Sequence, residues 1–272
     1  MTGDHQEGFK VAMTKEMCDR PTAFFDSGLG GLSVLREAVK LMPHEDYLYF
    51  GDSANAPYGT KTIEEIQALT LKNVERLYRS GIKALVIACN TATSAAIHLL
   101  REIYTDIPVV GIEPALKPAV SISEHPNVIV MATPLTVKAQ KFRDLLGQYE
   151  SKASVTPLSC PGLMEFVERG ELDTPELKQY LRALLEPVLS DHQIDAIVLG
   201  CTHYPFLREE IRKIAGESVM ILDGGLGTAQ QLRRKLSTEN LLSRRSRQGI
   251  IRYEESDPSR IPLCKALMAR PF

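Results

Sequence analysis

Short apolar runs alternate with longer amphipathic segments along most of the chain. The runs at 22–25 and 47–50 are apolar or aromatic at nearly every position, which is typical of strands buried on both faces of a parallel sheet. Between such runs, apolar residues recur every three or four positions, as Ile66, Leu69 and Val74 do, which is typical of helices packed by one face. The alternation predicts an α/β fold with mainly parallel sheets.

The same pattern continues through most of the sequence. Further strands are predicted at 85–87, 109–112, 128–131, 155–158, 197–199 and 219–222, and helices over 62–79, 163–168, 206–215 and 228–236, with others following Leu32, Thr133 and Thr174. Pro114 and Pro118 interrupt the pattern, which indicates a crossing point between two lobes. We therefore expect two similar α/β lobes, and the motifs alone allow a simple two-way split of the chain.

Two of the apolar runs end in the same way. The stretch 83–93 reads KALVIACNTAT and the stretch 195–205 reads DAIVLGCTHYP, so each run leads into a cysteine followed by small polar residues. Ligands of open α/β sheets gather at the carboxyl ends of the strands. We therefore expect Cys89 and Cys201 to face one cleft between the lobes.

Charge and cysteine usage narrow the function classes. A formal net charge of −2 gives no reason to expect nucleic acid or an anionic membrane as the main partner. No uninterrupted apolar segment approaches the ~20 residues that cross a bilayer, and residues 1–21 form a polar extension without the apolar stretch of a secretion signal. Five cysteines without a C-x-x-C pair favour reduced thiols, so we expect a cytoplasmic protein.

A glycine-rich turn follows the first strand. It reads Asp26-Ser27-Gly28-Leu29-Gly30-Gly31 and leads into a helix, and the first backbone N–H groups of a helix can bind an anion. A dinucleotide fingerprint would need a third glycine where Ser33 stands, and no Walker lysine follows. The turn is therefore either an anion site or only a tight change of direction.

The paired thiols allow several interpretations. Buried cysteines are usually inert small hydrophobes. Zinc could be held by Cys89, Cys160, Cys201 and His203, although their spacings match no common zinc pattern. A cysteine nucleophile with His203 as its base would need only one thiol and would leave the repetition unexplained. Each thiol is also predicted to lie at a helix start, where the dipole favours the thiolate.

Proton transfer at a stereocentre explains both thiols. Removing the α-proton of an amino acid flattens the carbon, and inversion then requires a proton from the opposite face. Two thiols on opposite sides can do this, one as thiolate and the other as thiol, because free thiols titrate near ~8.5. No lysine stands in the polar residues that follow either cysteine, so nothing implies pyridoxal phosphate, and we expect no cofactor and no metal.

Five separate motifs point to one family. The motifs are Asp26-Ser27-Gly28, Pro57-Tyr58-Gly59, Cys89-Asn90-Thr91-Ala92, Thr133 with Thr136, and Gly200-Cys201-Thr202-His203-Tyr204-Pro205. They stand in the same order as in the cofactor-independent aspartate/glutamate racemases. Between about Thr22 and Leu236 the chain resembles glutamate racemase, which makes D-glutamate for cell-wall peptidoglycan.

The resemblance implies a role for each site residue. Cys89 would take the α-proton of D-glutamate and Cys201 that of L-glutamate, with Asp26 beside the first thiol and His203 beside the second. Glu168 resembles a further acidic group near the second thiol, although an exposed helix carboxylate is an equal alternative. The implied substrate-binding residues are Ser27, Pro57, Tyr58, Gly59, Asn90, Thr91, Thr133 and Thr202.

The resemblance also implies how the chain is divided and assembled. Residues 22–114 and 223–272 would form the first lobe and residues 115–222 the second, with the active site between them, in a homodimer. Two rival functions stay open. An aspartate racemase would keep both thiols, whereas a non-catalytic amino-acid-binding protein would use the same cleft without needing them.

Overall fold

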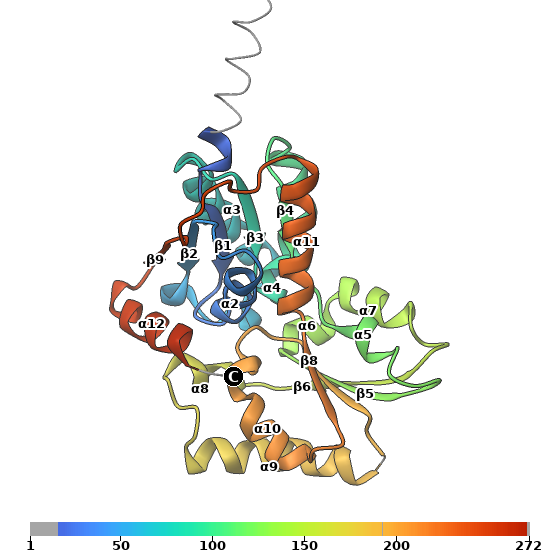
Figure 1. Cartoon of the computed structure of the whole chain (residues 1–272). Coiled ribbons are helices and arrows are strands. Elements are labelled where there is room, and N and C mark those ends of the chain that lie inside the picture. The colour runs from blue at the N-terminus through green and yellow to red at the C-terminus, as the bar shows by residue number, and fades with distance from the viewer. Residues whose placement is uncertain (1–15, 192, 271–272) are drawn as a thin grey trace, which may run out of the picture.

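The computed structural model describes residues 16–191 and 193–270. Of the predicted N-terminal extension, residues 1–15 lie outside this range. The described chain contains two parallel β-sheets, each flanked by helices (Figure 1). We refer to the elements around the five-stranded sheet as the first lobe and to those around the four-stranded sheet as the second lobe. The predicted fold class, two α/β lobes with parallel sheets, is confirmed.

The first sheet has the strand order β4-β3-β1-β2-β9, and all its pairs are parallel. Helices α3 and α4 pack against each other, and α2 packs against α11. The strands are β1 (Thr22–Asp26), β2 (Tyr47–Gly51), β3 (Ala84–Ile87), β4 (Val109–Gly111) and β9 (Ile251–Glu255), and the helices are α2 (Leu32–Leu41), α3 (Ile63–Arg79), α4 (Asn90–Ile103), α11 (Gly225–Thr238) and α12 (Ile261–Ala269).

The second sheet has the order β6-β5-β7-β8 and is also parallel throughout. Its strands are β5 (Asn127–Ala132), β6 (Ser154–Ser159), β7 (Ala196–Leu199) and β8 (Met220–Asp223). Its helices are α5 (Leu116–Ala119), α6 (Pro134–Lys138), α7 (Gln140–Gly147), α8 (Leu163–Glu168), α9 (Pro175–Asp191) and α10 (Arg208–Ala215). No helix in the described part of the chain is both long enough and apolar enough to span a lipid bilayer.

One apolar cluster runs through both lobes. It includes Phe24 and Tyr49 from the first sheet and Met131 and Leu199 from the second, and all four are almost fully buried. Closely packed interiors resist relative displacement of their elements. The shared core therefore supports the carboxyl ends of β1 and β7 at one place in the molecule.

The structure differs from the sequence-based expectation at several elements. Strand β9 and the helices α5 and α12 were not predicted, and the helix predicted after Thr133 is divided at Ala139 into α6 and α7. Strand β9 was missed because it reads IRYEE and is only partly buried. The helix predicted over 206–215 begins with a 3-10 turn at Tyr204–Leu207 and becomes α-helical only at Arg208. Cys201 therefore does not lie at the start of an α-helix.

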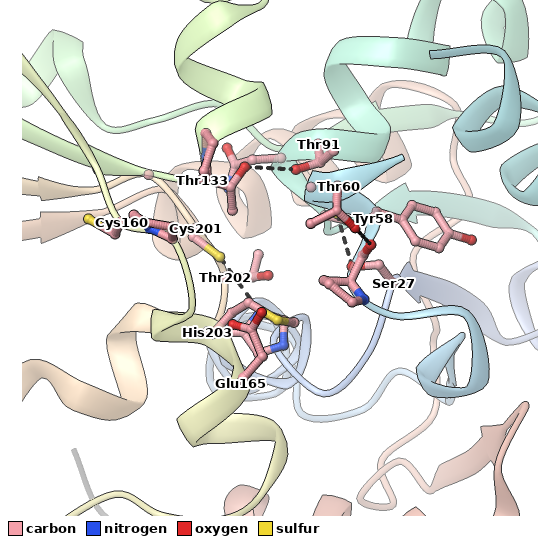
Figure 2. A pocket seen from close by; sticks show the side chains of 18 of the residues that line it. Ser27, Tyr58, Thr60, Thr91, Thr133, Cys160, Glu165, Cys201, Thr202 and His203 are labelled. Carbon is pink, nitrogen blue, oxygen red and sulfur yellow. Dashed lines mark hydrogen bonds between the residues drawn. The ribbon is translucent and has the colours of Figure 1, made fainter. Parts of the chain in front are cut away.

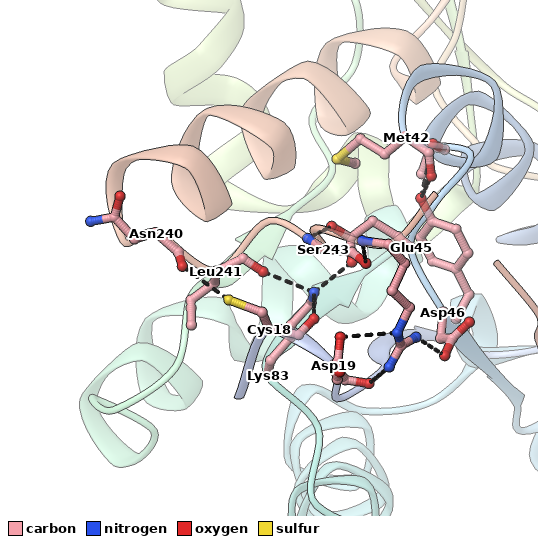
Figure 3. A network of polar contacts seen from close by, with 12 residues as sticks. Cys18, Asp19, Met42, Glu45, Asp46, Lys83, Asn240, Leu241 and Ser243 are labelled. Atoms are coloured by element: carbon pink, nitrogen blue, oxygen red, sulfur yellow. Dashed lines mark hydrogen bonds and ion pairs between the residues drawn. The ribbon is translucent and has the colours of Figure 1, made fainter. Parts of the chain in front are cut away.

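A buried ion pair fixes the entry to β3. The Lys83 ammonium is fully buried, lies 2.5 Å from the Glu45 carboxylate, and donates to the main-chain carbonyls of Cys18 and Leu241 (Figure 3). Glu45 in turn accepts a hydrogen bond from the Ser243 N–H. A buried charge is tolerated only when it is paired and hydrogen-bonded in this way. The network joins three distant segments at the strand that leads to Cys89.

Ion pairs hold the arginines of the segment that leads into β9. Arg245 pairs with Asp19 and Asp46, and Arg247 also pairs with Asp46. Burial alone would raise the pKa of Asp46, but the hydrogen bonds from these arginines lower it to about 2. The loop is thus held to the first lobe by ion pairs.

Candidate active site

Each thiol stands directly beyond the carboxyl end of a buried strand. Cys89 follows β3 and is the N-cap of α4, and its sulfur accepts a hydrogen bond from the Ala92 N–H at 3.4 Å. Cys201 follows β7 after Gly200, where a Cβ atom would lie 2.8 Å from the carbonyl oxygen of Met131. The small residue at 200 lets the chain pass close to β5. The two strands belong to different sheets, so the thiols come from different lobes.

One cavity of about 80 Å³ is lined by both cysteines. In Figure 2, Ser27, Tyr58 and Thr60 from the first lobe lie across the cavity from Cys160 and Cys201 of the second. Eleven of the predicted site residues line it, namely Ser27, Pro57, Tyr58, Gly59, Cys89, Asn90, Thr91, Thr133, Cys201, Thr202 and His203. The two remaining predicted residues, Asp26 and Glu168, lie behind this lining.

Sequence reasoning missed several lining residues. Thr60, Pro134, Cys160, Pro161, Gly162, Met164, Glu165 and Gly200 also face the cavity. Some signals were present, because Thr60 follows the Tyr58-Gly59 motif and Cys160 ends a strand of the same sheet as Cys201. No lysine or arginine is among the described residues that line the cavity. A bound carboxylate would therefore meet hydroxyl, amide and backbone groups.

The first thiol is almost completely buried. Cys89 is only 5% exposed, and its sulfur lies 3.3 Å from the Ser27 hydroxyl. Burial, with the nearby charge of Asp26, raises the pKa of Cys89 to about 12, and Cys201 is close enough to contribute to the rise. The expectation that the helix start would favour the thiolate is therefore wrong for Cys89, because desolvation outweighs the dipole.

Asp26 connects the lobes rather than lining the cavity. It is completely buried, and its Oδ2 accepts a hydrogen bond at 3.0 Å from the Thr202 hydroxyl of the second lobe. Its Oδ1 accepts from the Gly28 N–H at 2.9 Å. Burial raises the pKa of Asp26, and the charge of His203 and these two hydrogen bonds oppose the rise. The carboxylate is thus placed behind Cys89, Thr202 and His203.

The second thiol begins a chain of three polar side chains. The Cys201 sulfur lies 3.6 Å from His203 Nδ1, and His203 Nε2 lies 2.7 Å from Glu168 Oε1. Burial alone would lower the pKa of His203, but its contacts with Cys201 and Glu168 raise it well above its ordinary value. Burial alone would raise the pKa of Glu168, but His203 lowers it. The arrangement favours an imidazolium held between Cys201 and the Glu168 carboxylate.

The glycine-rich turn binds an anion that belongs to the protein itself. The Leu29 N–H donates to Glu168 Oε1 at 2.7 Å. A Cβ at Gly28 would lie 2.1 Å from that same oxygen, and one at Gly30 would lie 2.4 Å from His203 Nδ1. The glycines are therefore needed because the catalytic-type side chains of the second lobe approach this backbone closely. Glu168 is buried, so the alternative of an exposed helix carboxylate is excluded.

Three threonine hydroxyls lie close together where α4 of the first lobe approaches the α6 region of the second. Thr91 of α4 lies 3.3 Å from both Thr133 and Thr136 of the α6 region, and the latter two are 2.9 Å apart. Each hydroxyl can donate one hydrogen bond and accept others. The cluster can therefore exchange one of its internal hydrogen bonds for a bond to a ligand.

Tyr58 contributes its ring and backbone to the cavity rather than its hydroxyl. The hydroxyl points away from Cys201 in Figure 2 and donates to Asp52 Oδ2 at 2.7 Å. Burial and Asp52 raise the pKa of Tyr58. Asn73 donates to the same carboxylate oxygen. Tyr58 is thereby held as a neutral phenol that fixes the neighbouring Gly59 in the lining.

The zinc interpretation receives no support from the side-chain positions. Within residues 16–191 and 193–270, no group of three or more His, Cys, Asp or Glu side chains is arranged to hold a metal ion. The polar groups around the cavity instead pair with one another, as in the link between His203 and Glu168.

Comparisons with known proteins agree on one family. Residues 30–232 match the family model described as Asp/Glu/Hydantoin racemase. Glutamate racemase of Clostridium novyi is 53% identical over 236 residues, which cover 87% of this chain and 91% of that protein. The crystal structure of glutamate racemase isoform RacE1 from Bacillus anthracis superposes with a TM-score of 0.81 at 32% identity, covering 91% of this chain and 92% of that one. The Francisella tularensis glutamate racemase in complex with D-glutamate gives a TM-score of 0.80 at 29% identity, with coverage of 94% and 96%.

Proposed function

This chain belongs to the Asp/Glu/hydantoin racemase family, and we propose that it interconverts L- and D-glutamate with Cys89 and Cys201 as its two acid/base groups. D-Glutamate made in this way supplies peptidoglycan synthesis. One observation carries the residue assignment: two thiols from the ends of strands in different sheets line a single cavity.

The reaction from L- to D-glutamate begins at the second lobe. The Cys201 thiolate, next to the His203 imidazolium, removes the α-proton and becomes a thiol. The Cys89 thiol gives its proton to the opposite face of the flattened carbon and becomes a thiolate. The high pKa of Cys89 suits a resting proton donor. The reverse reaction exchanges these roles, and proton exchange with water returns both thiols to their starting states.

The two thiols have different polar neighbours. Burial and the nearby Asp26 raise the pKa of Cys89, which favours the protonated thiol. Beside Cys201, Glu168 holds His203 in its charged form. The two environments thus differ, as a two-base reaction requires.

Stabilising the carbanion falls to neutral donors. When the α-proton leaves, negative charge spreads onto the α-carboxylate, and hydrogen-bond donors placed there stabilise it in a site that excludes water. Ser27, Asn90, Thr91 and Thr202 offer hydroxyl, amide and backbone donors around the cavity. Thr133, Pro57, Tyr58 and Gly59 complete its wall.

The wider organisation is part of the proposal. We propose a cytoplasmic homodimer in which residues 22–114 with 223–272, and residues 115–222, form the two lobes. Strand β9, which returns from the end of the chain to pair with β2, supports the discontinuous first lobe. Sedimentation equilibrium tests the dimer, since a monomer at assay concentration would contradict it.

The function is tested with L-glutamate in deuterated water without added cofactor. Chiral chromatography with mass detection should show D-glutamate that carries deuterium at the α-carbon. Both enantiomers of aspartate are assayed in parallel, and faster inversion of aspartate would establish the sister activity instead. Binding of glutamate without any inversion by the wild-type protein would identify the non-catalytic binding protein.

A further inference from the structure

The last part of the chain, which lies beyond the residues 30–232 matched by the family model, contacts Glu168 near the second thiol. Residues beyond 232 form β9 and α12, which belong to the first lobe because β9 pairs with β2. Between these two elements lies the 3-10 turn Pro258–Arg260, and Arg260 is the N-cap residue of α12. Asp257 caps the turn by accepting from the Ser259 N–H. Arg260 is thus presented by a locally ordered turn.

Arg260 makes a contact between the lobes. Its Nη1 donates at 2.7 Å to the main-chain carbonyl of Glu168, the last residue of α8. Figure 1 shows α12 beside α8 in this region. The last carbonyls of a helix have no partner within the helix and carry the negative end of its dipole. A guanidinium is therefore well suited to hold the end of α8 against the first lobe.

The first lobe consequently holds Glu168 at two points. The Leu29 N–H binds its carboxylate and Arg260 binds its carbonyl, each at 2.7 Å. The surrounding space is tight, since a Cβ at Gly28 would lie 2.1 Å from Glu168 Oε1 and one at Gly170 would lie 3.3 Å from the Leu263 side chain of α12. Little movement of Glu168 is possible while both contacts persist.

We propose that Arg260 is a positioning residue for the Cys201 half of the reaction, because it holds the end of α8 so that the Glu168 carboxylate keeps His203 against Cys201. The inference rests on the proposed function of the two thiols. Burial alone would raise the pKa of Glu168, and the charge of Arg260 adds to the effect of His203 in lowering it. Geometry and charge therefore act in the same direction.

Loss of the Arg260 contact should affect only one of the two proton transfers. Cys89 contacts Ser27 and the Ala92 N–H, neither of which is bound to Arg260. Loss of the guanidinium would therefore slow proton transfer at Cys201 and leave the transfer at Cys89 as it was. A merely structural loss, by contrast, would impair both transfers together.

Isotope effects separate these outcomes. L- and D-glutamate have equal free energies in water, so kcat/KM is the same in both directions for every variant. The primary isotope effect of α-deuteration on kcat/KM, by contrast, can differ between the two directions. If the Cys201 step becomes slower, the isotope effect rises for α-deuterated L-glutamate, whose deuterium Cys201 removes. It falls for α-deuterated D-glutamate, whose deuterium Cys89 removes.

The experiment compares Arg260→Gln, Arg260→Lys and the control Lys265→Ala, which changes an exposed cation of the same helix. Loss of a charged hydrogen-bond donor is expected to lower kcat/KM about threefold to thirtyfold in Arg260→Gln, with the opposite changes in the two isotope effects. Arg260→Lys keeps the charge and should restore much of the activity. Lys265→Ala should match the wild type.

Two results would overturn the inference. One is an Arg260→Gln enzyme in which the two isotope effects stay as in the wild type or move together, and the other is an equal effect from Lys265→Ala. If Arg260→Gln does not fold, the same isotope comparison on Arg260→Met, which keeps the length of the side chain but loses the charged donor, decides the question. Failure of the proposed function would look different, because the wild-type protein itself would not invert glutamate.

Discussion

Replacing Glu168 by glutamine tests the chain of side chains behind Cys201. The amide has the same size as the carboxylate, and its oxygen can accept both the Leu29 N–H and the His203 Nε2–H, as Glu168 Oε1 does at 2.7 Å in each case. The geometry should therefore be retained while the negative charge is lost. Any change in activity then reports the charge rather than the packing.

The size of the effect follows from the hydrogen bond to His203. Such a bond contributes about 1.5–3 kcal/mol when one partner is charged and about 0.5–1.5 kcal/mol when both are neutral. The substitution should thus remove about 1–1.5 kcal/mol, close to the ~1.4 kcal/mol that corresponds to one pKa unit or tenfold in rate. We expect kcat/KM to fall about fivefold to tenfold.

The pH dependence gives the direction. Although burial alone would lower the pKa of His203, Cys201 and Glu168 hold it well above its ordinary value. Removing the charge of Glu168 must lower that pKa, so the imidazolium is lost at a lower pH. The upper limb of the profile of kcat/KM against pH should move about one unit toward acid.

The assay is circular dichroism of glutamate between pH 6 and about 10, with Glu171→Gln as the control. Glu171 is a partly exposed carboxylate that pairs with Arg169 just beyond α8. The Glu171→Gln variant should leave both kcat/KM and its pH profile unchanged. A Glu168→Gln enzyme with wild-type kcat/KM, or one whose upper limb does not move, would refute the role given to this carboxylate.

Three further substitutions test the scaffold. Lys83→Met leaves Glu45 buried without its cation, and urea unfolding should show a loss of about 3–5 kcal/mol; an unchanged midpoint would contradict this. Burial raises the pKa of Glu255 to about 7, so ionisation of this carboxyl destabilises the fold as the pH rises through that value. Glu255→Gln should therefore raise the free energy of unfolding by about 1–3 kcal/mol at pH 8 but hardly at pH 5. Gly28→Ala would press on Glu168 and should lower kcat/KM by ~10-fold to ~100-fold, whereas Gly147→Ala, where a Cβ meets nothing within 4 Å, should not.

The strands and the thiols at their ends were predictable because their signals are local. A parallel strand is a continuous apolar run, and a polar residue directly after it must lie at the carboxyl edge of the sheet. Cys89 and Cys201 satisfy both conditions in the sequence itself. Strand β9 could not be found in this way, because an edge strand that is partly exposed carries charged residues.

The hydrogen bonds between the lobes could not be predicted from local sequence patterns. Asp26 and Thr202 are 176 positions apart, and Arg260 and Glu168 are 92 apart. Glu168 could be suggested only by resemblance, since its helix alone allowed an exposed carboxylate equally well. The pKa of Cys89 was misjudged for a related reason, because the depth of burial depends on packing that the sequence does not specify.

The most direct test of the central claim uses one-thiol variants in deuterated water. Cys89→Ala keeps Cys201, so it should exchange the α-hydrogen of L-glutamate with solvent, without inversion and without exchange of D-glutamate. Cys201→Ala should do the reverse. Proton NMR of the α-hydrogen with chiral chromatography follows both processes. Inversion at the wild-type rate by either variant, or exchange of the enantiomer assigned to the missing thiol, would contradict the two-base account.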